Sequence, residues 1–111
     1  MESILTSIKK LLGITEDYEV FDTDIIIHIN TAFTILHQLG VGPKEVFQIH
    51  DKFSYWSDFI ETGSAESVKT YVYLRVRALF DPPSSSIANE ALKETIKELE
   101  FRLNVSEDTT Y

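Results

Sequence analysis

Cysteine is absent from the 111-residue chain. The sequence therefore offers no disulfide, no thiol nucleophile and no thiolate metal ligand, which fits a cytoplasmic protein. Long apolar runs are also absent, since none approaches the roughly 18 residues that a membrane-spanning helix needs. We expect no contact with a membrane. The opening residues MESILTSIKKLLG place their lysines after the first apolar residues, so no secretory signal is expected there.

Positive charge is scarce. The chain has 10 lysines and arginines against 18 aspartates and glutamates, which gives a net charge of −8. Residues 65–81 form the one stretch with a positive sum, and no basic stripe runs along the chain. Ordinary binding of nucleic acid through phosphate contacts is therefore not expected. An acidic surface is still compatible with DNA that slides past without specific binding.

Four helical patterns account for most of the chain, whose 43% hydrophobic residues suffice for one globular domain. Apolar residues recur at helical spacing over 4–12, 22–39, 65–80 and about 86–103. Gly13 and Gly40 follow the first two patterns and predict helix ends. In the third helix we expect Val68, Tyr71, Val72, Val76 and Leu79 to face inward. In the fourth, the predicted inner face is Ile87, Ala88, Ala91, Leu92, Ile96, Leu99 and Leu103.

The segment between the second and third helices differs in character. Gly42 and Pro43 interrupt the chain, and VFQIHDKFSYW then combines aromatic and β-branched residues around a polar centre. This pattern favours a short β-hairpin, with a brief helical turn from Ser57 to Ile60. The predicted fold class is all-α: a small bundle of about four helices, with a short β-hairpin or an irregular excursion between helices two and three.

No constellation of catalytic or metal-binding residues stands out. Asp22 and Asp24 form an Asp-x-Asp pair, but Asp22 stands where a helix N-cap belongs and Asp24 suits the first turn. Ser84 to Ser86 offer N-caps for the fourth helix, and Ser86 is the cap that we expect. His28 and His37 lie on opposite sides of their predicted helix and cannot share a metal. We therefore expect no catalytic residue, no metal and no cofactor, and we predict that the protein is not an enzyme.

Two features indicate a macromolecular partner. The aromatic residues of the 47–59 segment either cover the end of the helical core or anchor an interface; Phe47, Tyr55 and Trp56 are the candidates. The third helix carries Arg75 and Arg77 within an apolar run, and arginine is well suited to partly buried ion pairs and to interfaces. A salt bridge to the acidic loop at 15–19 and a contact with another subunit both remain open for these arginines.

Six segments together resemble the head–tail connector family of tailed phages and prophages, in the same order and over nearly the whole chain. They are LLGI (11–14), FDTDIIIHINTAF (21–33), QLGVGP (38–43), WSDF (56–59), VKTYVYLRVRALFDPP (68–83) and IKELEFRLN (96–104). The most specific part is FDPP followed by a last helix that ends in E-x-R-L-N.

The resemblance implies a structural protein of the virion neck that is made and assembled in the host cytoplasm. Connectors of this kind form a homo-oligomeric ring below the portal protein, extend the DNA channel and carry a stopper or tail-completion protein. We expect residues 1–104 to form a single helical connector domain and the polar residues 105–111 to form a flexible C-terminal tail. Portal docking is expected at the end of the last helix and in the tail, with Arg102, Asn104, Val105 and Tyr111 as candidates.

One alternative comes from the acidity of the chain. An acidic helical interaction protein could mimic DNA and inhibit a nucleic-acid enzyme. Such a mimic needs dense acids along one continuous face, whereas acids and bases alternate on the outer face of the fourth predicted helix.

Overall fold

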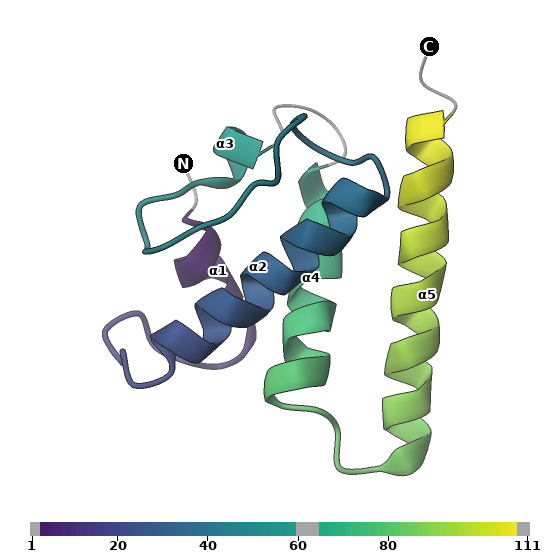
Figure 1. Ribbon diagram of the computed structural model, residues 1–111. Coiled ribbons are helices and arrows are strands. Elements are labelled where there is room, and N and C mark those ends of the chain that lie inside the picture. Colours follow the sequence, from purple (N-terminus) through teal and green to yellow (C-terminus); the bar gives the residue numbers. More distant parts are fainter. Residues whose placement is uncertain (1–2, 60–64, 109–111) are drawn as a thin grey trace.

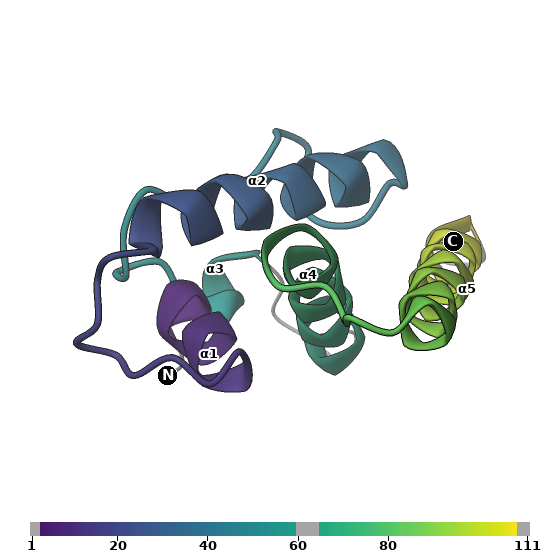
Figure 2. The ribbon, with the colours of Figure 1, turned by 90° about the horizontal axis from the view of Figure 1, so that it is seen from below.

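The computed structural model describes residues 3–59 and 65–108. Five helices lie within these ranges: α1 (Ile4–Leu11), α2 (Asp22–Gln38), α3 (Trp56–Phe59), α4 (Ala65–Phe80) and α5 (Ser86–Asp108). The predicted all-α class is confirmed. Figure 2 shows α1, α4 and α5 side by side in a row, with α2 lying across one face of that row. The described part of the chain contains no helix that is long and apolar enough to cross a membrane.

The first two helices end as predicted. Gly13 and Gly40 both have positive φ, at 83° and 82°, a conformation that glycine adopts at little cost. The backbone N–H of Ile14 donates to the carbonyl of Lys9, and that of Val41 donates to the carbonyl of Leu36. These bonds are characteristic of the Schellman motif, which satisfies carbonyl groups at a helix C-terminus.

The two predicted helix caps are wrong by one residue each. Helix α2 begins at Asp22 itself, after Phe21, which forms no side-chain cap. The Asp22 carboxylate is instead engaged by the ammonium group of Lys9, 2.8 Å away. At α5 the cap is Ser85 and not Ser86, because the Ser85 hydroxyl accepts from the N–H of Ala88 at 3.3 Å. Helix α5 also continues to Asp108, past the expected end near 104.

The predicted hairpin is wrong, and the irregular alternative is correct. Among the described residues, the one β pairing is an isolated bridge between Ser3 and Tyr55. The hydrogen bonds that the segment makes to distant residues go to α1 and α2. The Asn30 side chain of α2 donates to the carbonyl of Ile49 at 2.9 Å and accepts from its N–H at 2.8 Å, much as a strand neighbour would. The predicted turn at 57–60 is the short helix α3, and Ile60 lies outside the described residues.

The core lies where α2 crosses α1 and α4. Helix α2 contributes Ile25, Ile29, Phe33 and Leu36 to it, and all four are fully buried. Four of the five residues predicted to face inward from α4 are fully buried, but Leu79 is 49% exposed.

On α5 the second half of the predicted inner face is correct. Leu92, Ile96 and Leu103 are buried and Leu99 is half-buried, whereas Ile87, Ala88 and Ala91 are exposed. Figure 1 gives the reason, because α5 begins below the last turn of α4 and its first turns have no helix beside them.

Candidate functional site

The aromatic residues proposed for an interface belong largely to the core. Phe33 of α2 lies at the centre of an aromatic cluster, with ring centroids 5.1 Å from Phe47, 4.8 Å from Phe59 and 6.2 Å from Trp56. Trp56 is only 7% exposed, and its indole N–H donates to the hydroxyl of Ser7 at 2.8 Å. This satisfied hydrogen bond explains how the indole can be buried. Phe47 is half-buried in the same cluster.

Gly42 allows this cluster to close. Its φ is +99°, and a Cβ atom added there would lie 2.5 Å from the ring of Phe59. The backbone therefore passes directly over that buried ring. A side chain at this position would meet both an unfavourable conformation and an occupied space.

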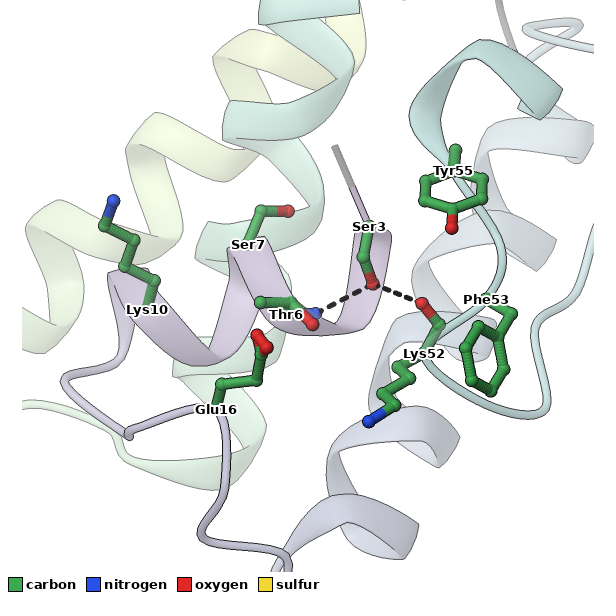
Figure 3. Close-up of a pocket in the computed structure, with 8 residues that line it drawn as sticks. All are labelled: Ser3, Thr6, Ser7, Lys10, Glu16, Lys52, Phe53 and Tyr55. Atoms are coloured by element: carbon green, nitrogen blue, oxygen red, sulfur yellow. Dashed lines mark hydrogen bonds between the residues drawn. The ribbon is translucent and has the colours of Figure 1, made fainter. Parts of the chain in front are cut away.

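A groove lies on the outer side of α1, between that helix and two loops. We name it the α1 groove; Figure 3 shows its lining residues, which are Ser3, Thr6, Ser7, Lys10, Glu16, Lys52, Phe53 and Tyr55. It is open and has a volume of about 420 Å³. The Ser3 hydroxyl donates to the carbonyl of Lys52 at 2.7 Å and accepts from the N–H of Thr6 at 3.2 Å, so it fastens the 52–55 segment to α1.

The charges of the α1 groove come from three side chains. In Figure 3, Glu16 lies below α1 between Lys10 and Lys52. All three are exposed, as is Phe53, whose ring lies 5.6 Å from the ammonium nitrogen of Lys52. Tyr55, which sequence reasoning proposed for an interface, is half-buried here. The groove thus combines two cations, one anion and an exposed aromatic ring.

Arg75 ties α4 to α5. Its guanidinium donates to the Glu100 carboxylate at 2.7 Å and to the Tyr71 hydroxyl at 3.1 Å, and that hydroxyl donates to the same carboxylate at 2.7 Å. The predicted salt bridge between Arg75 and the acidic loop at 15–19 is therefore wrong, because Arg75 pairs with a carboxylate of α5 instead. Arg77 donates to the hydroxyl of Tyr73 at 3.3 Å and is half-buried.

This network shifts the ionisation of its members. Burial raises the pKa of the Tyr71 phenol well above its usual value, and Glu100 adds to the effect while Arg75 opposes it. Burial on its own would lower the pKa of Arg75, but hydrogen bonds to Tyr71 and Glu100 raise it overall. The phenol therefore stays neutral and the guanidinium charged, which keeps all three hydrogen bonds intact.

The residues proposed for portal docking lie near the end of α5. Arg102 is exposed and pairs with Glu98 at 2.6 Å. The Asn104 side chain donates to the carbonyl of Leu39 at 3.2 Å, so it holds α5 to the end of α2. Val105 is 39% exposed. Tyr111 lies outside the described residues.

Sequence reasoning missed the most deeply buried charged side chain among the described residues. Lys9 is 2% exposed; it donates to the carbonyl of Glu16 at 2.9 Å and pairs with Asp22. The signal was available, because Lys9 is four residues from Leu5 and three from Leu12 and so shares their apolar face.

The histidines show no shared site. The ring of His28 lies beside Phe80, with centroids 6.5 Å apart, while Nε2 of His37 lies 2.9 Å from the carbonyl oxygen of Lys44. Within residues 3–59 and 65–108, no group of three histidine, aspartate or glutamate residues could hold a metal ion.

The fold and these surfaces can be compared with known proteins. A family model described as "Phage connector protein" matches residues 4–110. No curated protein and no solved structure matches the chain. The match spans all five helices and agrees with the resemblance found in the sequence. The chain therefore belongs to the phage connector protein family.

Proposed function

We propose that this protein is the adaptor that joins the head of a tailed phage or prophage to its tail. In this proposal, copies of the chain form a ring below the portal protein, the ring extends the DNA channel, and a stopper or tail-completion protein binds to it. The observation that carries the proposal is the family match over residues 4–110, which makes the chain a structural component of a phage particle. Assembly follows in the host cytoplasm, and the virion neck is the final location.

The charge of the chain supports a channel through which DNA slides. A wall that neutralised many phosphates would bind DNA and slow its passage. An acidic chain, with a net charge of −8, is suited to a channel wall that does not bind DNA in this way. The alternative of a DNA mimic is less well supported, because the acids on α5 have bases beside them: Glu90 with Lys93, Glu94 with Lys97 and Glu98 with Arg102.

The end of α5 is the proposed contact with the portal. Arg102 and Val105 are exposed there, and Asn104 fixes the helix to α2. A helix held in this way presents its last turns in a defined direction. We propose that these turns, together with Tyr111, dock on the portal.

Native mass spectrometry tests the proposal directly. The purified chain is measured alone and mixed with the portal protein encoded in the same phage or prophage. We expect a closed ring of this chain or a stoichiometric complex with the portal. A chain that stays monomeric at low and moderate salt, and that ignores the portal, would contradict the adaptor function.

A further inference from the structure

The molecule has two opposite edges with different surfaces. In Figure 2, α1 and α5 stand at the two ends of the row of helices, with α4 between them. The α1 groove lies at the first edge. At the other edge, the side of α5 that holds Leu92, Ile96 and Leu103 faces α4.

The side of α5 opposite this contact carries a second regular row of residues. At 100° per residue, positions 87, 91, 94, 98 and 101 fall on one side of the helix, on average about 140° from Leu92 and about 160° from Ile96. We name this row, Ile87, Ala91, Glu94, Glu98 and Phe101, the α5 stripe. Ile87 is 83% exposed and Phe101 is 69% exposed. A partner that lies along this row would cover both side chains and remove their apolar surface from water, which favours association.

We infer that the α5 stripe of one subunit docks in the α1 groove of the next copy of the chain. The inference rests on the proposed ring and names the surfaces that would build it. The charges of the two surfaces are complementary, because the middle of the stripe presents Glu94 and Glu98 while the groove presents Lys10 and Lys52. The exposed rings of Phe53 and Phe101 give each surface an apolar anchor.

The internal ion pairs of the stripe do not prevent this docking. Glu94 lies 3.9 Å from Lys97, and Glu98 lies 2.6 Å from Arg102, with all four side chains more than half exposed. Exposed pairs of this kind contribute little, about 0–1 kcal/mol. The two glutamates can therefore turn to the lysines of a neighbour. Glu16 within the groove, together with Asp17 and Glu19 beside it, leaves this edge without a net positive charge, so the attraction depends on direct pairing of Lys10 and Lys52 with the two glutamates.

The α1 groove of one subunit is occupied by the α5 stripe of another subunit. Two α5 stripes do not pair with each other. A two-fold pairing of α5 with itself would bring Glu94 of both copies together at the centre, with Glu98 close by, and like charges in contact repel. A stripe in a groove instead joins two different surfaces. Because these surfaces lie on opposite edges, each added copy leaves one of each open, which is the head-to-tail contact that builds a ring.

Cross-linking tests this contact, since the chain has no cysteine of its own. The variants are Phe53→Cys and Phe101→Cys, both at exposed positions where folding is not expected to suffer. The two single variants are mixed, assembled alone or on the portal, and treated with a short bis-maleimide. We expect covalent dimers from the mixture and ladders up to the full ring from the double variant. The control replaces Phe53→Cys by Ile27→Cys, a position on α2 with a similar exposure of 56%.

The outcomes separate this contact from the proposed function. Dimers from the mixture, and none from either variant alone or from the control, support the inference. A ring that native mass spectrometry detects but that gives no link between positions 53 and 101 overturns the inference and leaves the adaptor function standing. Dimers of Phe101→Cys alone also overturn it, because they show α5 against α5. A chain that assembles neither alone nor with the portal overturns both.

Discussion

Gly42 shows how one residue can hold an irregular segment in place. The 41–55 segment has no β pairing beyond the single bridge of Tyr55 with Ser3, and it packs on the core through the ring of Phe47 and the backbone at Gly42. Phe59 is 5% exposed and lies against both Phe33 and Phe47, so a shift of its ring would disturb these aromatic contacts. The cost of a larger residue at position 42 is therefore steric as well as conformational.

Gly42→Ala is expected to destabilise the protein more than Gly13→Ala. Both positions have positive φ, which costs a residue with a Cβ atom about 1–2 kcal/mol. Only Gly42 faces the Phe59 ring, while a Cβ at Gly13 meets no atom within 4 Å. Overpacking adds about 1–3 kcal/mol. Urea unfolding followed by circular dichroism measures both variants, and equal losses would show that the ring yields.

At the scale of elements, the regular features were predictable from the sequence. The helical spacing and the glycines at 13 and 40 are local signals, and the observed helices follow them. The hairpin prediction was wrong because the decisive bonds come from Asn30, 19 residues before Ile49. Local pattern contains no information about such a partner. The exposed start of α5 was missed for the same reason, since it depends on where α4 ends in space.

The candidate site was harder to predict than the fold. Trp56 and Phe47 looked equally suited to a core and to an interface, and only their contacts with Phe33 show the core packing. Residue type alone therefore did not separate the two roles. The α1 groove combines residues from 3–16 and 52–55, which no local pattern connects.

Lys9 joins two helices through a buried charge. Lys9→Met would remove the partner of the Asp22 carboxylate, which is 25% exposed, and a donor to Glu16. We expect the free energy of unfolding to fall by about 2–4 kcal/mol. This value is toward the lower end for broken buried ion pairs, because the Asp22 side chain is partly exposed to solvent. The matched control is Lys97→Met, whose exposed pair with Glu94 should contribute about 0.5 kcal/mol or less. Unfolding in urea compares them, and similar losses would contradict the role of Lys9.

The contact between α4 and α5 should weaken at high pH. Folding raises the pKa of Tyr71 above the usual tyrosine value of 10.0, so the folded state holds its proton more tightly than the unfolded state does. This contribution to stability is fully present below about pH 10 and is lost as pH rises toward the higher folded pKa.

Above pH 10 we expect the free energy of unfolding to fall by up to about 1.4 kcal/mol per pH unit because of Tyr71. Other groups also titrate in this range, so the comparison is with Tyr71→Phe, which should show a shallower decline. Urea unfolding at several alkaline pH values gives both slopes. Parallel slopes would mean that the buried phenol does not control the alkaline loss.

For the whole molecule, the inferred contact depends on four individual charges and not on the net charge of either edge. The chain is acidic overall, yet Lys10 and Lys52 meet in one groove while Glu94 and Glu98 lie on the far edge. A head-to-tail assembly that depends on these four residues has a specific signature. Reversing the charges on one edge should block assembly, and reversing both edges should restore it.

The variant Lys10→Glu/Lys52→Glu is therefore expected to assemble on the order of 100-fold more weakly, because like charges then face each other across the contact. Adding Glu94→Lys and Glu98→Lys should recover most of the loss. The control, Lys44→Glu/Lys93→Glu, changes the net charge of the chain by the same amount at exposed positions outside both surfaces. Sedimentation velocity over a concentration series measures the assembly of all three. If the control weakens assembly as much as the groove variant does, general repulsion explains the effect. If the four-residue variant stays as weak as the groove variant, the two surfaces do not meet.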